Sequence, residues 1–172
     1  MATTYEIIAS VTVGSGGAAN IEFTSIPATY TDLSIVFSIR CARSDVIEPG
    51  MLRFNGSTSN YSLRRLNGDG SSVASSAVSG ETGMIFGDIN GDTATSNTFG
   101  NGSIYIPNYA GSNFKSVSTD VVVENNATES SQYLLAGLWS DTSAITTIRL
   151  YSRNSHNFNE HSTAYLYGIS NA

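Results

Sequence analysis

The chain has 172 residues, a mass of 18.2 kDa, a formal net charge of −6 and a pI of about 4.7. A chain of this size can bury about 70% of the surface that its unfolded form exposes, so a core can form without disulfides or metal. Its 40% hydrophobic content excludes wholesale disorder, and its acidic balance argues against a nucleic-acid partner, since phosphates are neutralised by basic patches. We expect one domain, spanning residues 1–172.

Alternating apolar residues predict a series of short strands. In the first, Tyr5, Ile7, Ala9, Val11 and Val13 share one face, which is the period of a half-buried strand. The other predicted strands are residues 20–24, 33–39, 51–54, 60–66, 84–89, 102–109, 114–124, 132–140, 145–151 and 162–169. The segment 33–39 has the cleanest alternation.

The segments between these strands read as turns and loops. Asn55-Gly56 suits the positive φ angles of a tight turn and predicts a hairpin between 51–54 and 60–66. We expect an irregular stretch over 41–50, a long mobile loop over 67–83 and a second polar loop over 90–101. At most one helical turn is expected, near 142–144.

Ten or eleven strands with turn signals every 8–16 residues are typical of an all-β sandwich or barrel. No segment has sustained helical periodicity, and no internal repeat indicates a propeller or solenoid. We therefore predict an antiparallel β-sandwich, with a jelly roll as the leading topology.

Charged residues make up only 13% of the chain, whereas a typical soluble domain has about 25%. A β-protein with so few charges must cover its sheet edges and much of its surface in another way. Other copies of the same chain, or a larger assembly, are the simplest cover. This favours a structural or binding module over an enzyme.

The remaining bulk features exclude further classes. A single cysteine, Cys41, allows no intrachain disulfide and is expected to be a small buried residue at a strand end. The N-terminal residues, from Met1 to Tyr5, have neither the basic region of a signal peptide nor a long apolar run. We expect folding in a cytoplasm and no membrane partner.

Two segments contain candidate metal ligands. Asp88-Ile89-Asn90-Gly91-Asp92 has spaced oxygen ligands, but Thr93 and Phe99 stand where a calcium loop needs glycine and glutamate. An ordinary polar turn is favoured, and loose calcium binding stays open. His156 and His161 flank a carboxylate, Glu160, but their spacing does not match helical zinc motifs, so a solvated loop is favoured.

No residue pattern supports catalysis. The chain has no Gly-x-Ser-x-Gly nucleophile elbow and no phosphate-loop or dinucleotide fingerprint. We expect no enzyme activity, no catalytic residues and no cofactor. A serine-histidine-aspartate triad or a glycosidase carboxylate pair is defined by geometry that the sequence does not contain.

Glycan recognition is the main binding alternative, because aromatic rings and amides suit sugars. Trp139 ends an apolar run, and a packing role is favoured for it and for Tyr165 and Tyr167. The freer candidates are Tyr30, Tyr61 and Tyr109, which we expect in loops. The closest approach to a basic patch is formed by Arg64 and Arg65, with Arg40, Arg43 and Arg53 nearby, and a scattered, salt-bridged set is favoured.

Seven segments, taken in their order and spacing, resemble a known family. They are residues 25–33, 52–56, 60–62, 106–110, 137–139, 143–148 and 162–169. The chain is similar over nearly its whole length to β-rich structural proteins of tailed-phage virions, of a kind common in cyanophages and marine phages. This resemblance implies a β-sandwich or jelly-roll virion component, often a trimer, located on a capsid surface or in a tail fibre.

The resemblance carries no catalytic residues to transfer. Together with the low charge, it predicts a capsid decoration or cement protein that bridges capsomers as a homo-oligomer, with the major capsid protein as its partner. A tail-fibre module that recognises a host glycan is the alternative, and a glycan-cleaving enzyme is a third reading. The interface residues are unknown at this point; the segments 41–50, 67–83 and 90–101 are the first places to look.

Overall fold

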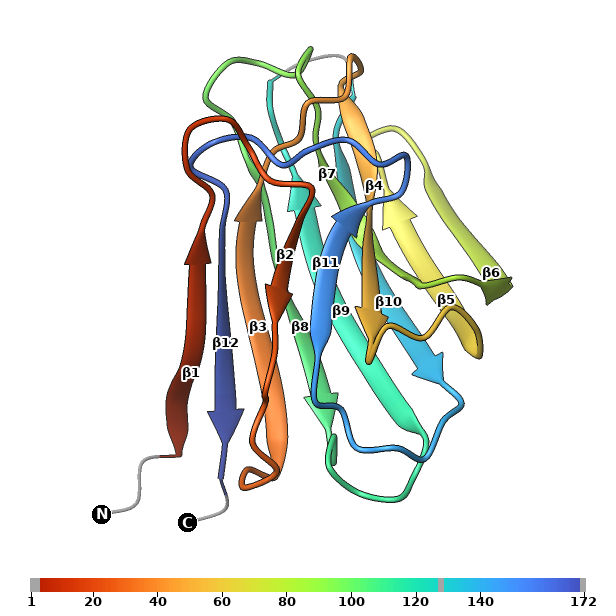
Figure 1. The fold of residues 1–172 in the computed structure, drawn as a ribbon. Coiled ribbons are helices and arrows are strands. Elements are labelled where there is room, and N and C mark those ends of the chain that lie inside the picture. Colours follow the sequence, from red (N-terminus) through yellow and green to blue (C-terminus); the bar gives the residue numbers. More distant parts are fainter. Residues whose placement is uncertain (1–3, 127–128, 171–172) are drawn as a thin grey trace.

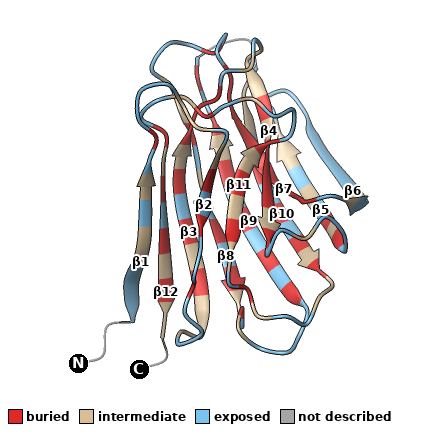
Figure 2. Ribbon diagram, viewed as in Figure 1, coloured by how far each residue is buried: buried red, intermediate tan, exposed pale blue. Residues whose placement is uncertain are grey.

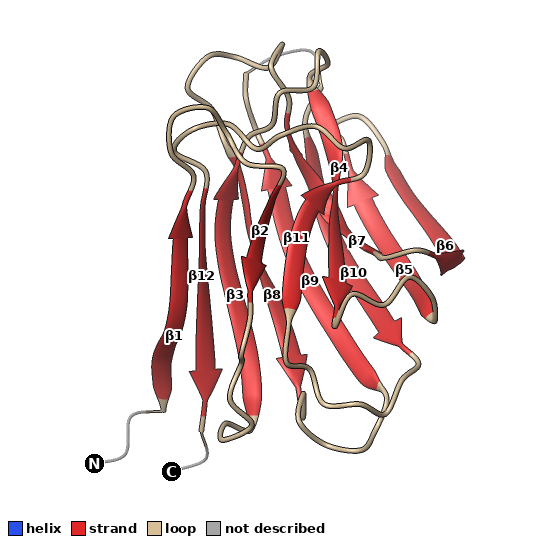
Figure 3. Ribbon diagram, viewed as in Figure 1, coloured by secondary structure: helices blue, strands red, loops and turns tan. Residues whose placement is uncertain are grey.

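A computed structural model describes residues 4–126 and 129–170 and confirms the all-β prediction. Strands form two sheets packed face to face, and no helix occurs in the described residues (Figures 1 and 3). The strands are β1 Tyr5–Thr12, β2 Asn20–Phe23, β3 Asp32–Ile39, β4 Ile47–Phe54, β5 Tyr61–Gly68, β6 Val73–Glu81, β7 Met84–Asn90, β8 Gly100–Pro107, β9 Lys115–Val123, β10 Ser131–Trp139, β11 Ile148–Ser152 and β12 Thr163–Ile169.

The two sheets differ in size. The larger has eight strands in the order β1-β12-β3-β8-β9-β10-β5-β6, and the smaller has four in the order β2-β11-β4-β7. Every strand pair is antiparallel, and four ladders join the two halves of the chain: β1 with β12, β2 with β11, β3 with β8, and β4 with β7. Strands β9, β10, β5 and β6 extend the larger sheet beyond β8.

The core lies between the sheets (Figure 2). In β3, Leu33, Ile35, Phe37 and Ile39 are all buried while the alternate positions are more exposed, as the alternation predicted. Strand β7 is buried at every position because it lies against β9 and β10. The ring of its Phe86 packs on that of Phe37, with 4.9 Å between the ring centroids.

The first strand departs from the predicted face. A β-bulge between Ile7 and Ala9 inserts one extra residue, so the side-chain alternation reverses there. Ala9, Val11 and Val13 are at least partly buried, but Tyr5 and Ile7 are exposed and point to the other side of the sheet.

The predicted hairpin across Asn55-Gly56 is wrong in its pairing although right in its turn. Both residues have positive φ angles, of 49° and 68°, and the Ser57 amide donates to the Phe54 carbonyl at 2.8 Å. The strands on either side enter different sheets, however: β4 belongs to the smaller sheet and β5 to the larger. The partner of β5 is β6 instead.

Two loop predictions also need correction. The stretch 67–83, predicted as a mobile loop, contains most of the β5–β6 hairpin. Its turn is stabilised by the Asp69 carboxylate, which accepts from the Ser71 and Ser72 amides. The irregular stretch 41–50 is shorter than expected, since β4 begins at Ile47 and includes Pro49. Residues 142–144 form no helical turn.

Candidate interaction surface

The candidate calcium residues do not form a loop. Asp88 and Asn90 belong to buried β7, so the favoured polar turn was wrong for them, because the strand continues through these polar residues. The turn begins only after the strand, at Asp92. Asp88 Oδ2 accepts hydrogen bonds from the Tyr133 hydroxyl at 2.8 Å and the Ser131 hydroxyl at 3.2 Å. Burial raises the pKa of this carboxyl. In residues 4–126 and 129–170, no three His, Cys, Asp or Glu side chains are grouped to hold a metal ion.

The histidine segment is a loop between β11 and β12, as predicted, but it is not simply solvated. Its Phe158 is fully buried and makes isolated bridges with Ala18 and Cys41. The expected burial of Cys41 is confirmed, and burial raises its thiol pKa to about 11. This loop therefore closes one end of the sandwich.

The tyrosines proposed for glycan binding are not free. Tyr61 and Tyr109 are 2% and 0% exposed, so the expectation that they are free was wrong, although Tyr109 does lie in the turn after β8. The Tyr61 hydroxyl accepts from the Phe54 amide, and the Tyr109 hydroxyl donates to the Pro27 carbonyl. Trp139 is buried against Tyr61 and Phe54, which confirms its packing role.

The other three tyrosines differ in where their side chains lie. Tyr30 is half-buried, and its ring occupies the space above Gly168. Tyr165 and Tyr167 do not pack in the core, because Ala164 and Leu166 fill the inward positions of β12. Both tyrosines lie on the opposite side of that strand.

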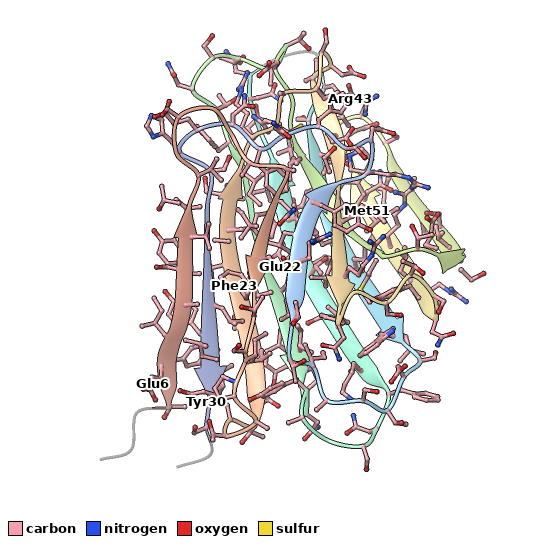
Figure 4. The ribbon with its side chains drawn as sticks, viewed as in Figure 1. Glu6, Glu22, Phe23, Tyr30, Arg43 and Met51 are labelled. Carbon is pink, nitrogen blue, oxygen red and sulfur yellow. The ribbon has the colours of Figure 1, made fainter. Side chains whose placement is uncertain are left out.

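The arginines are scattered, as predicted, and several are structural. Arg40 is 8% exposed, and its guanidinium donates to the carbonyls of Asp92, Ala94, Thr95 and Thr98 at 2.9–3.0 Å. Figure 4 shows Arg43 among the loops at the same end of the sandwich, where it pairs with Asp45 and with the fully buried Glu48.

The surface that carries the clearest functional signal is the outer face of the eight-stranded sheet, meaning the side chains that point away from the smaller sheet. The burial alternation and strand register assign alternate residues of each strand to it. In the described strands, the charged residues at these positions are Asp32, Arg64 and Asp120. The remaining positions are occupied by serine, threonine, asparagine, glutamine, glycine, proline and apolar residues.

Exposed hydrophobic side chains gather on this outer face. Of nine large ones that are exposed, all but Phe114 lie on it: Tyr5, Ile7, Val36, Leu66, Val73, Tyr105, Leu134 and Tyr165. Exposed apolar side chains scattered singly are ordinary, but a set confined to one face indicates a contact surface.

The set forms two clusters. The tyrosine cluster, near β1, consists of Tyr5, Ile7, Val36, Tyr105 and Tyr165, and Val36 lies directly opposite Tyr165 across the β3–β12 ladder. The aliphatic cluster, near β6, consists of the other three, Leu66, Val73 and Leu134, together with the half-buried Val122 beside them.

In the aliphatic cluster, Leu134 lies opposite Leu66 across the β10–β5 ladder. All four residues line one groove of about 430 Å³, and a second groove of about 650 Å³ continues between β9 and β6. Neither groove is lined by an aromatic ring.

The outer face of the smaller sheet has the opposite character. Arg149 pairs with Glu22 at 3.3 Å, and Arg53 lies over the Tyr151 ring, 4.9 Å from its centroid. Figure 4 shows Glu22 on β2, at the edge of this sheet. The two broad faces therefore differ: the smaller one carries an ion pair and an arginine–tyrosine contact, and the larger one is nearly uncharged.

Comparison of the chain with protein-family models, curated proteins and solved structures finds no match. The candidate surface therefore rests on its own geometry. Sequence reasoning predicted that some surface would need cover, but it did not find which one. The strands do have uncharged residues at alternate positions. These residues can be recognised as one face only when the order of the strands in the sheet is known. The described part of the chain contains no helix of the length and apolarity that would cross a membrane.

Proposed function

We propose that this protein is a structural component of a tailed-phage virion, which decorates or cements the capsid shell as a homo-oligomer. The observation that carries the proposal is the chemical difference between the two broad faces of the sandwich. The nearly uncharged outer face of the eight-stranded sheet would contact the major capsid protein or other copies of the chain. The ion-paired face of the smaller sheet would remain in water.

The size of the outer face supports this role. Eight strands have seven spacings of about 4.8 Å between them, and each strand is about 26 Å long, so the face spans about 900 Å². A stable protein–protein interface buries about 800 Å² on each partner. The outer face is therefore large enough to hold the protein on a shell, and each bridging copy would add interface area that must break before capsomers separate.

The sandwich topology agrees with the proposed class. The ladders β1–β12, β2–β11, β3–β8 and β4–β7, split between two sheets in the orders β1-β12-β3-β8 and β2-β11-β4-β7, are the pairing expected of an eight-stranded jelly roll. We infer that β5–β6 and β9–β10 are insertions into this jelly roll that widen one sheet. The trimeric state and the capsid-surface location follow from the family resemblance alone.

The first test is the copy number of the protein in purified virions, relative to the major capsid protein, by quantitative mass spectrometry. A number comparable to that of the capsid protein is the expected result. A handful of copies would place the protein in the tail, and absence from the virion would overturn the proposal.

A second test addresses the surface itself. Leu134→Asp puts a charge in the aliphatic cluster and should abolish binding of the purified protein to capsids that lack it. Phe114→Asp is the matched control, because Phe114 is as exposed, at 55% against 53%, but precedes β9 and belongs to neither cluster. Equal binding by the two variants would exclude this face as the contact.

The tail-fibre alternative retains one specific observation, the exposed rings of Tyr5, Tyr105 and Tyr165 in the tyrosine cluster. Aromatic faces on a rigid sheet suit sugar rings, whereas Tyr61 and Tyr109 are too buried to serve. Saturable binding to host polysaccharide, lost in Tyr165→Ala and retained in Leu134→Asp, would favour glycan recognition over capsid binding.

A further inference from the structure

The eight-stranded sheet ends at β6, which is exposed on both faces. Its burial pattern contains no buried residue, and Val73 is 75% exposed. Figure 2 shows β6 as an exposed strand at the margin of the molecule, and Figure 1 shows it turned away from the smaller sheet. From Val73 to Gly80 the strand carries neither a charged residue nor a proline.

The other three sheet edges are protected. Strand β1 is interrupted by its bulge and carries Glu6. Strand β2 has only four residues and an ion-paired Glu22. Strand β7 is buried, and its Phe86 carbonyl accepts a hydrogen bond from the Thr119 hydroxyl at 2.9 Å. Bulges, shortness, charge and covering are the usual protections of edge strands. Of these, β6 has a bulge between Ser79 and Glu81 and the charge of Glu81, both at its far end, so the segment 73–79 has none.

The direction of the free backbone groups on β6 follows from the ladder. In the β5–β6 hairpin, the Asp69 amide donates a hydrogen bond to the Ser72 carbonyl at 3.2 Å. Beside the β10–β5 ladder, the Ser140 amide donates to the Asn60 carbonyl at 2.9 Å. Because bonded and non-bonded pairs alternate in antiparallel sheets, both contacts place the bonds from β6 to β5 at residues 74, 76 and 78. The N–H and C=O groups of Val73, Ser75 and Ala77 therefore point away from the sheet.

We propose that β6 pairs with β6 of a second copy of this chain, antiparallel and across a two-fold axis. A two-fold axis perpendicular to the sheet keeps both outer faces on the same side, so it pairs residues of the same face. An axis at Ser76, the midpoint of the uncharged segment 73–79, places Ser75 opposite the partner's Ala77 and Val73 opposite the partner's Ser79. The backbone groups at all four positions are available for ladder bonds.

The chemistry of the strand favours a second copy as the occupant. Every side chain between Val73 and Ser79 is small or β-branched and uncharged, so no like charges meet in the self-pairing. The nearest carboxylate, Glu81, is paired with Arg153 at 3.0 Å. Pairing also joins two eight-stranded sheets into one, so the two aliphatic clusters become parts of a single, wider uncharged face.

This contact is independent of the proposed virion role, since the purified chain alone tests it. If the protein is also a trimer, a two-fold contact joins neighbouring trimers rather than subunits within one. Two outer faces held together would bind a shell with the added strength of a bivalent ligand.

Sedimentation-velocity ultracentrifugation of the purified chain, up to millimolar concentration, tests the pairing. Ala77→Pro removes an N–H that points away from β5, so it should leave the hairpin intact, as prolines on edge strands do. Two-fold symmetry removes the bond twice, which should weaken self-association at least about tenfold. Ala77→Ser keeps the N–H and should associate as the native chain does.

Hydrogen exchange provides the second readout. Amides of Val73, Ser75 and Ala77 should exchange more slowly at high than at low protein concentration, while those of β1 should not change. A native chain that shows no β6-mediated association at millimolar concentration overturns the proposal. So does undiminished self-association of a folded Ala77→Pro variant, which would place the contact elsewhere on the molecule.

Discussion

The hydroxyl of Tyr133 donates a 2.8 Å hydrogen bond to Asp88, joining β10 of the larger sheet to β7 of the smaller. Both side chains are buried, at 7% and 4% exposure. The Asp88 carboxylate accepts hydrogen bonds from few donors, and burial raises its pKa. Asp88 therefore binds a proton more tightly in the folded state than in the unfolded chain. The contribution of Asp88 to stability is therefore greatest in acid and declines as pH rises through its folded pKa.

Tyr133→Phe should destabilise the protein by about 1–3 kcal/mol at neutral pH, because a buried carboxylate loses a donor. The loss should shrink in acid, where Asp88 is protonated. Urea denaturation at both pH values measures this, with Tyr165→Phe on the exposed face as the control. Equal losses at the two pH values would show that the hydroxyl does not act through the carboxylate.

Glu48 should have the opposite pH dependence. Burial alone would raise its pKa, but donors from Ser152, Asn154 and Arg43 outweigh burial and lower it. Stability from Glu48 is present above its unfolded pKa, near 4.5, and is lost as pH falls through the folded value.

Glu48→Gln should therefore cost about 3 kcal/mol at pH 7 and should flatten the loss of stability in acid. Denaturation curves from neutral pH to strong acid measure both effects. Glu22→Gln, at a partly exposed ion pair, should change stability by less than about 1 kcal/mol. An unchanged acid profile in Glu48→Gln would refute the assignment.

Arg40 shapes the connection from β7 to β8 by donating to four of its carbonyls. Lysine cannot present a planar fork to four acceptors, so Arg40→Lys should destabilise the protein by about 2 kcal/mol and expose this loop to proteases. Limited proteolysis with mass spectrometry locates the cleavage. Arg64→Lys on the outer face should leave the cleavage pattern unchanged, and equal digestion of the two variants would contradict the role of Arg40.

Lys115 is the chain's single lysine, is fully buried, and donates to the carbonyls of Gly111 and Asn113. Burial also lowers its pKa. Amine-reactive esters should label Lys115 far more slowly in the native protein than in urea. Burial keeps the ester away from the amine, and the hydrogen bonds hold the amine in place. Peptide mass spectrometry reads the two rates, and rapid native labelling would show that the 111–115 turn opens readily.

Several features of the fold were predictable because they depend on local sequence. The clean alternation of β3 matched the structure, since a strand with one buried face must repeat its apolar residues every second position. The strand predicted over 84–89 matched β7. The Asn55-Gly56 turn was predicted for the same kind of reason. The strand partners around this turn were not, because turn chemistry does not determine which sheet the next strand joins.

Strand β6 was not predicted, because its sequence lacks the alternation of apolar and polar residues. Its serines, alanines and glycine have low hydrophobicity, and an edge strand exposed on both faces needs no alternation. The backbone pairing with β5 and the turn at Asp69 determine its structure instead. Likewise, Tyr61 and Tyr109 read as loop tyrosines, but the packing of the opposite sheet encloses them.

The sequence by itself determined the all-β class, the single small core and the scarcity of charge, because these depend on composition and on the two-residue period of strands. Only the tertiary structure decided where the uncharged positions meet. Eight strands drawn from the whole length of the chain contribute to the outer face, and β1, β12 and β3 become neighbours through pairings across more than a hundred residues. A face made of such distant segments has no local signature, because hydrogen-bond pairing between strands, rather than sequence order, places them side by side.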